Sequence, residues 1–157
     1  KAIYHCCKLA KANNCRIALS LSDSFCVDRH REELCDLINK YVDIIFANEM
    51  EIQSLYQSNL QESLKKIREV VEIGAITLGF KGSIVFQNQV KNLVSAIIVN
   101  DPVDTTGAGD IFASGFLFGL INKYSIEDCG KLGSKVASDI IKYIGARPKI
   151  SFKTFLN

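Results

Sequence analysis

The sequence DPVDTTGAGDIFASGFLFGL occupies residues Asp101–Leu120. Three small residues, Gly107, Ala108 and Gly109, stand between a polar turn and an apolar run that predicts a helix. Small residues let the backbone approach a ligand closely, and N–H groups at a helix N-terminus favour an anion. Asp110 follows in the first helical turn, where a carboxylate lies beside any bound phosphate and can accept a proton from an attacking hydroxyl.

Two common phosphate-binding motifs do not fit this loop. The P-loop requires G-x-x-x-x-G-K-[ST], and the loop has no such lysine. The Rossmann fingerprint begins at Gly107 and Gly109 but has Phe112 in place of its third glycine. A lone GxGD would be explained by a tight strand-to-helix turn with Asp110 as a partner of the helix dipole. The whole run DTTGAGD, followed by SGFL, favours a ligand site instead.

The segment Asp104–Leu117 resembles the C-terminal signature of the PfkB family, which includes ribokinase, adenosine kinase and fructokinase. The resemblance implies transfer of a phosphoryl group from ATP, with Mg²⁺, to a primary hydroxyl of a sugar or nucleoside. It implies that Asp110 is the general base and that the N–H groups of Gly107, Ala108 and Gly109 form the anion hole. Phosphoryl transfer depends mainly on positioning and charge stabilisation, which such a loop can provide.

Two earlier segments match the same family in the same order. The sequence ANEME resembles the N-x-x-E element through Asn48 and Glu51, which implies a magnesium ion held through waters. From residue types alone, Asn48 could simply cap a helix that starts with acidic residues. The sequence TLGFKGS resembles the nucleotide-side T-x-G-x-x-G loop through Thr77, Gly79 and Gly82, and a plain hairpin turn is the alternative.

The resemblance extends to the end of the chain. The stretch Lys135–Pro148 resembles the helix and loop that flank the adenine base, a role compatible with an amphipathic core helix. Thr106 belongs with the nucleotide-binding residues of the loop. Family members also hold a monovalent cation, such as K⁺, beside the anion hole. The matching positions here are Asp104, Thr106 and the backbone near Gly145.

Hydrophobic periodicity predicts an α/β fold. The predicted strands are 16–22, 42–48, 75–80, 83–88 and 95–100. The predicted helices are a first helix with apolar spacing over 3–10 that stops at Asn13 and Asn14, followed by 28–40, 49–56, 60–71, 109–122 and 126–144. Alternating strands and helices indicate a mostly parallel sheet flanked by helices on both faces, which matches a ribokinase-like domain. The closely spaced strands around Gly82 predict one antiparallel hairpin.

Composition excludes several other classes of protein. The net charge is +2, from 19 basic and 17 acidic residues, which gives no electrostatic reason to expect a nucleic acid or a membrane partner. No apolar run approaches the roughly 20 residues that cross a bilayer. The six cysteines form no C-x-x-C pair. They are typical of free, mostly buried thiols in a reducing cytoplasm.

The resemblance covers the later part of the family's domain. We therefore assign residues 1–157 to the C-terminal nucleotide-binding and catalytic part, and we expect the N-terminal substrate and lid part to be absent. Such a fragment should be inactive alone, and its strand 16–22 should pair with a second copy or with the missing half. The run Ser22–Glu33 and the GARP ending resemble adenosine-kinase-like members of the family, and this resemblance implies adenosine or ribose as substrate. A vitamin kinase of the same superfamily and a non-catalytic nucleotide-binding module are the alternatives, and the presence of Asp110 favours catalysis.

Overall fold

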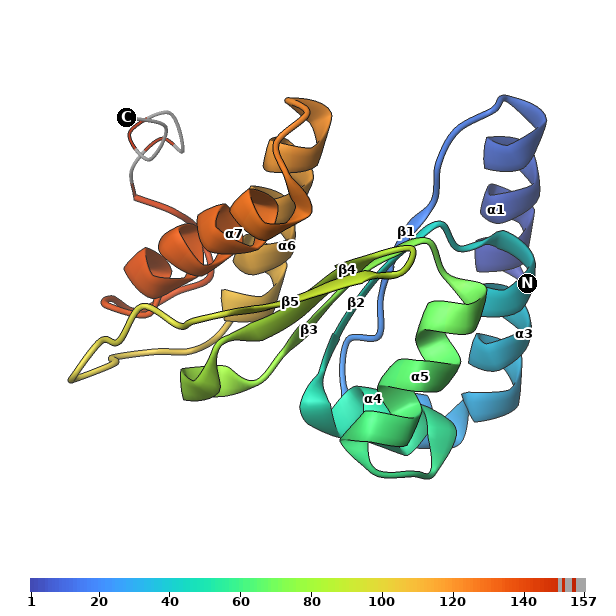
Figure 1. Ribbon diagram of the computed structural model, residues 1–157, viewed down its shortest axis with the longest axis horizontal. Helices are drawn as coiled ribbons and strands as arrows, with labels where there is room; N and C mark the ends of the chain where they lie inside the picture. The colour runs from blue at the N-terminus through green and yellow to red at the C-terminus, as the bar shows by residue number, and fades with distance from the viewer. Residues whose placement is uncertain (150, 152–153, 155–157) are drawn as a thin grey trace. The chain divides into compact units, whose positions relative to one another are not determined.

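The computed structural model describes residues 1–149, 151 and 154. In chain order its elements are α1 (Ala2–Ala12), β1 (Ala18–Ser20), α2 (Ser24–Arg29), α3 (Arg31–Tyr41), β2 (Ile44–Asn48), α4 (Glu49–Tyr56), α5 (Leu60–Val70), β3 (Ile73–Thr77), a 3-10 turn (Gly79–Lys81), β4 (Ser83–Gln87), β5 (Val90–Val94), α6 (Ala108–Ile121) and α7 (Ile126–Ile140) (Figure 1). The described part of the chain divides into two compact units. The first comprises residues 1–76 and 86–90, and the second comprises residues 77–85 and those from 91 onward.

The strands of the described residues form one five-stranded sheet in the order β1-β2-β3-β4-β5. β1 and β2 are parallel, with Ala18 opposite Ile44 and Ser20 opposite Phe46. β3, β4 and β5 follow one another through short connections, at residues 78–82 and 88–89, which can join only antiparallel neighbours. The sheet is therefore mixed and flanked by helices. This confirms the predicted α/β fold and the hairpin around Gly82.

One predicted strand is wrong. The apolar run 95–100 forms no regular strand, and β5 lies at Val90–Val94, where the sequence predicts only a turn and a polar stretch. Asn88 makes the preceding turn possible because its φ of 51° lies in the left-handed region that asparagine tolerates. The guanidinium of Arg68 donates to the carbonyl of Gln89 at 2.8 Å and holds this turn. The run 95–100 is apolar for another reason, since several of its side chains line a cavity.

The helices match the prediction with three differences. The predicted helix 28–40 is two helices, because α2 ends and α3 begins on either side of His30. α2 starts earlier than predicted, at Ser24, where the Asp23 carboxylate accepts a hydrogen bond of 2.8 Å from the N–H of Cys26. The last predicted helix ends at Ile140 and not at residue 144.

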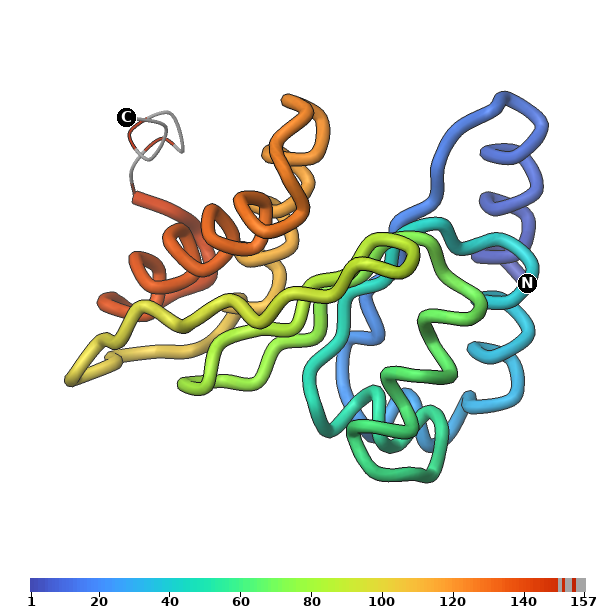
Figure 2. Tube along the Cα trace, viewed as in Figure 1, coloured from blue at the N-terminus to red at the C-terminus, as the bar shows by residue number. Residues whose placement is uncertain are grey.

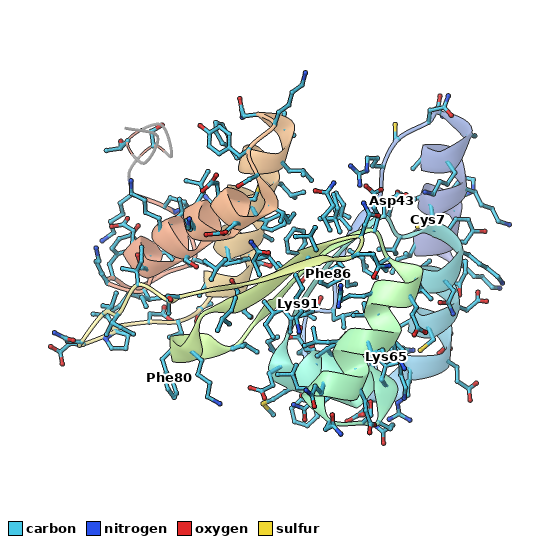
Figure 3. The ribbon with its side chains drawn as sticks, viewed as in Figure 1. Cys7, Asp43, Lys65, Phe80, Phe86 and Lys91 are labelled. Carbon is cyan, nitrogen blue, oxygen red and sulfur yellow. The ribbon has the colours of Figure 1, made fainter. Side chains whose placement is uncertain are left out.

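The first unit has its core between the strands and the helices of its own segment. The side chains of β2 from Ile44 to Ala47 are all buried, as a strand covered on both faces requires. Ile52 of α4 and Ile67 of α5 are fully buried. Gly74 in β3 leaves the space that the ring of Phe86 fills, since a Cβ there would overlap the ring. Phe86 is one of the side chains labelled in Figure 3.

The second unit is built on the close pairing of α6 and α7, which run side by side in Figure 2. Glycines allow this approach. A Cβ on Gly115 would lie 2.6 Å from Cγ2 of Val136, and one on Gly133 would lie 2.9 Å from the carbonyl oxygen of Phe112. Phe116 is fully buried in the same unit. α6 is therefore held firmly, and its N-terminus is a fixed point for the loop that precedes it.

Within the described residues, no helix is long and apolar enough to span a membrane. The six cysteines, all of which lie in the described part, carry free thiols. Cys7 and Cys129 are buried, and burial raises the pKa of Cys129 to about 11. Cys6 and Cys15 are exposed, so the expectation of mostly buried thiols is only partly met.

Candidate functional site

The loop before α6 turns sharply at Gly107. Gly107 caps the helix with a φ of 77°, in the left-handed region that glycine adopts without strain. A Cβ on Gly107 would lie 2.6 Å from the Cβ of Ala146. The backbone at Gly107 therefore approaches Ala146 more closely than a residue with a side chain could. The carbonyl of Gly107 accepts the N–H of Ile111 at 2.9 Å, which starts the helical ladder. The sequence thus fixes where α6 begins.

The three amides predicted as an anion hole differ in their local bonding. The N–H of Ala108 donates to the carbonyl of Thr105 at 3.1 Å. For the N–H groups of Gly107 and Gly109, the described residues provide no acceptor. The Cβ position of Gly109 is open, with no heavy atom within 4 Å. Two amides at the positive end of α6 are therefore available to an anion, and Ala108 can join them only by giving up its turn bond.

Asp110 stands in the first turn of α6 and is exposed. Its backbone carbonyl accepts a hydrogen bond of 2.8 Å from the hydroxyl of Ser114. None of the described side chains donates a hydrogen bond to its carboxylate or forms an ion pair with it. A free carboxylate one residue after the open amide of Gly109 is in a suitable position to act as a base beside a bound phosphate.

Asp104 joins the loop to the segment that follows α7. One carboxylate oxygen accepts the N–H of Thr106 at 2.9 Å, and the other accepts the N–H of Gly145 at 3.0 Å. These hydrogen bonds, that from Gly145 first, hold the pKa of the Asp104 carboxyl below its usual value. The N–H of Val103 also donates to the carbonyl of Ile141 at 2.7 Å. Asp104 therefore shapes the loop whether or not it also binds a cation, which stays a prediction.

The glycines of the β3–β4 connection serve the turn itself. Gly79 and Gly82 have φ values of 61° and 102°. The carbonyl of Gly82 accepts the N–H of Leu78 at 2.8 Å. A Cβ on Gly82 would overlap the carbonyl oxygen of Val94. Glycine at position 82 is thus explained by the hairpin alone, and a nucleotide role for Thr77, Gly79 and Gly82 stays a prediction.

The second unit contains a cavity of about 380 Å³, a size that suits a small-molecule ligand. Its wall brings together Thr77 at the end of β3 and Gly79 and Gly82 of the β3–β4 connection with Ala108 and Gly109 from the start of α6. The remaining predicted residues of this unit, Asp104, Thr106, Gly107 and Asp110, belong to the same loop and helix start but do not line the cavity.

Much of the cavity wall was not predicted from sequence. The unpredicted part includes Phe80, the run 96–99 and Phe112. Ala137 and Ile141 also line the cavity, and they lie within the stretch 135–148 that resembles an adenine-flanking segment. The sequence of the run 96–99 was interpreted as part of a strand, because an apolar β-branched sequence indicates a strand as readily as the wall of a ligand site.

Asn48 and Glu51 belong to the first unit and form a complete capping box at the start of α4. The N–H of Glu51 donates to the Asn48 side chain at 2.9 Å, and both the N–H and the side-chain amide of Asn48 donate to the Glu51 carboxylate, at 2.9 and 2.7 Å. Glu51 is only 6% exposed. Burial raises the pKa of the Glu51 carboxyl, and the negative charge of Asp23 raises it further. The hydrogen bond from the backbone N–H of Asn48 acts in the opposite direction.

This arrangement fits magnesium only indirectly. Within the described residues, no group of three or more His, Cys, Asp or Glu side chains is placed to hold a metal ion. Mg²⁺ keeps several waters and takes few protein ligands, so two oxygen-bearing side chains could hold it through its waters. The capping alternative for Asn48 is confirmed, and the magnesium role stays a prediction.

Comparison with known proteins identifies the family. The model of the pfkB family of carbohydrate kinases matches residues 1–152. This chain belongs to that family. Its relatives include an adenosine kinase from Dictyostelium discoideum, 32% identical over 167 residues, an alignment that covers 94% of this chain and 49% of the relative.

Solved structures of pfkB-type kinases have the same fold. A probable sugar kinase protein from Rhizobium etli CFN 42 is 44% identical with a TM-score of 0.93, and the match covers 98% of this chain and 47% of that one. The adenosine kinase of Sinorhizobium meliloti is 40% identical with a TM-score of 0.93, and covers 98% and 48%. The chain thus spans about half the length of these pfkB relatives.

Proposed function

We propose that the protein containing this chain is an ATP-dependent kinase that phosphorylates a primary hydroxyl of a sugar or nucleoside. The observation that carries the proposal is the cavity whose wall includes the open start of α6, at Ala108 and Gly109, in a member of the pfkB family. Since the chain spans about half the length of its relatives, the activity is proposed for the whole protein.

Different parts of the site suit different parts of the nucleotide donor. Its apolar wall suits the base, while the open amides of Gly107 and Gly109 suit the phosphates. Thr77 and the glycines of its turn stand on the wall where the donor would pass. Asp104 keeps the loop in shape through its bonds to Thr106 and Gly145.

The proposed chemistry uses Asp110 as the base. The acceptor hydroxyl donates a hydrogen bond to the Asp110 carboxylate and transfers its proton there as its oxygen attacks the γ-phosphorus. The bond between that phosphorus and the bridging oxygen breaks, and ADP leaves. The amides of Gly107 and Gly109 stabilise the charge on the transferring group. The unpaired state of the Asp110 carboxylate supports this role.

Two cations complete the proposal. Magnesium, when bound, neutralises charge on the phosphates, and Asn48 and Glu51 would hold it through waters. A monovalent cation, such as K⁺, would lie at Asp104, Thr106 and the backbone near Gly145. Each Asp104 oxygen accepts one N–H bond and retains a second lone pair, so the donor set is compatible with this role.

Adenosine or ribose is the favoured acceptor. Relatives named adenosine kinase, at 32% and 40% identity, support a nucleoside, and a relative named ribokinase, at 36% identity over 115 residues, supports ribose. A cytoplasmic location and pairing through β1 with a second copy or with an N-terminal half stay predictions.

The test is an ATP-consumption assay on the whole protein with adenosine, ribose, fructose and pyridoxal. We expect acceptor-dependent turnover on the order of 1–100 per second with adenosine or ribose. Turnover mainly with pyridoxal would indicate the vitamin-kinase alternative. Binding of Mg-ATP with no turnover on any acceptor would contradict a kinase and indicate a nucleotide-binding module.

A further inference from the structure

The chain that follows α7 contacts the loop before α6 at two points. These contacts come from the middle of residues 143–149 (the 143–149 loop; Figure 1). The N–H of Gly145 donates to the Asp104 carboxylate at 3.0 Å. Ala146 lies so close to Gly107 that a Cβ on the glycine would be 2.6 Å from the Cβ of Ala146. The shape of the loop before α6 therefore depends on where the 143–149 loop lies.

Tyr143 joins the two ends of the 143–149 loop. Its hydroxyl donates to Oδ2 of Asp139, near the end of α7, at 3.2 Å. The same hydroxyl oxygen accepts the N–H of Lys149 at 3.2 Å. The ammonium of Lys149 also lies over the Tyr143 ring, 4.5 Å from its centroid. One side chain thus closes the 143–149 loop and ties it to α7.

The 143–149 loop has few other hydrogen bonds to hold it. Within the described part of the chain, positions 144–149 make two, from Gly145 to the Asp104 carboxylate and from Lys149 to the Tyr143 hydroxyl. If the second bond is lost, the contact with Asp104 has to hold the 143–149 loop against its own conformational freedom. The Tyr143 hydroxyl therefore has a large share in fixing this segment.

The ring of Tyr143 has a separate role in packing. It is half-buried and packs against a cluster of buried apolar side chains, Ile111, Leu132, Val136 and Ile140. Phenylalanine at position 143 would keep this packing and the contact with the Lys149 ammonium, and it would remove only the hydroxyl. The bonding and packing roles of Tyr143 can therefore be measured independently.

We propose that Tyr143 is a positioning residue for phosphoryl transfer. Its hydroxyl fixes the 143–149 loop, which in turn holds Asp104 and Gly107 and so sets the direction of the open amides before Asp110. This inference rests on the proposed function, because its effect falls on the transferring phosphoryl group. A small displacement of groups that position the reaction lowers the rate even when its cause is remote. Interactions that are stronger in the transition state than in the bound substrate affect kcat.

The test is steady-state kinetics of the whole protein carrying Tyr143→Phe. This change should lower kcat by about 5- to 150-fold, the range for two lost hydrogen bonds, and change the KM for ATP by less than about threefold. Hydrogen exchange gives a readout that does not depend on turnover. The amide of Gly145 should exchange faster in Tyr143→Phe than in wild type, while the amides in the middle of α6 should exchange at unchanged rates.

Asp139 provides a conservative rescue. Asp139→Asn keeps an oxygen that can accept the Tyr143 hydroxyl, so kcat should stay within about threefold of wild type. Asp139→Ala removes that acceptor and should lower kcat. Asp139 also forms an ion pair of 3.5 Å with Lys142, whose side chain is exposed, and such pairs contribute little. Adding Asp139→Ala to Tyr143→Phe should lower kcat little further, because the shared bond is already absent.

The matched control is Tyr4→Phe, the same chemical change in the first unit. The Tyr4 hydroxyl donates to the Asp36 carboxylate at 2.9 Å and to the carbonyl of Glu33 at 3.1 Å, between α1 and α3. Tyr4→Phe should keep kcat within about twofold of wild type.

Three results would overturn the inference and leave the proposed function standing. They are an unchanged kcat in Tyr143→Phe, an equal loss of kcat in Tyr4→Phe, and a raised KM for ATP with unchanged kcat, which would mean that Tyr143 acts on nucleotide binding alone. A wild-type protein without turnover on any acceptor would contradict the proposed function itself, and this inference with it.

Discussion

Replacing Gly109 by alanine separates the stability of α6 from its proposed role in binding phosphate. The Cβ of alanine would enter open space, with no heavy atom within 4 Å. Gly109 is the second residue of α6, and its φ is not positive. Alanine is favoured over glycine in a helix by about 1 kcal/mol, less near the end. The free energy of unfolding should therefore stay the same or rise by up to about 1 kcal/mol.

Activity should change in the opposite direction. If the phosphoryl group lies against the amide of Gly109, the added methyl group displaces it from that donor. Loss of one such donor costs about 10²–10³-fold in turnover in other enzymes, so Gly109→Ala should lower kcat/KM by about 10²-fold or more. The assay pairs urea unfolding with steady-state kinetics of the whole protein.

The matched control is Gly115→Ala, two turns further along α6. Its Cβ would lie 2.6 Å from Cγ2 of Val136, so this variant should lose about 1–3 kcal/mol of stability through overpacking and keep most of its activity. If Gly109→Ala kept kcat/KM within about twofold of wild type, the open space would not be a phosphate site.

Three further predictions concern the loop and its support. Gly107→Ala should destabilise the protein by more than about 1–2 kcal/mol in urea unfolding, because alanine is strained at φ 77° and would also displace Ala146; no loss would contradict the loop geometry. Because the pKa of Asp104 is lowered in the folded protein, its hydrogen bonds stabilise the fold at pH values above about 4, the ordinary pKa of a carboxyl group. This stabilisation is lost as the pH falls through the lower pKa of the folded state. The free energies of unfolding of wild type and Asp104→Asn should thus differ at pH 7 and converge in acid, and a constant difference would exclude this linkage. Phe116→Ala, at a fully buried site, should cost about 3–5 kcal/mol, against less than about 0.5 for the exposed Ile121→Ala, and similar values would contradict the assigned core.

Local sequence predicted those parts of the fold that depend on local physics. α4 begins and ends as predicted, at Glu49 and Tyr56, because its capping residue and acidic first turn are neighbours in the chain. The start of α6 was predicted within one residue from its small residues. The run 95–100 was mispredicted as a strand. Hydrophobicity indicates that side chains are shielded from water, and it does not indicate what shields them.

The candidate site was predictable in its motifs and less so in its surroundings. The signature loop located Gly107, Gly109 and Asp110 in the sequence. In the described part of the structure, the N–H groups of the two glycines and the carboxylate of Asp110 have no hydrogen-bond partner. The turn bond from Ala108 to Thr105 depends on the folded loop and has no sequence signal. Phe80 was included in a predicted strand, because its place on the cavity wall arises from tertiary packing.

The role of Asp110 can be measured by replacing it with asparagine in the whole protein. Asp110→Asn keeps the size of the side chain and removes the base, so turnover should fall by roughly 10²–10⁴-fold. Affinity for Mg-ATP, measured in the same preparation, should change little. The matched control is Ser114→Ala, one turn along α6, which removes a hydroxyl that bonds only the backbone carbonyl of Asp110 and should leave turnover nearly unchanged. A loss of less than about tenfold in Asp110→Asn, with Mg-ATP still bound, would show that Asp110 is not the general base.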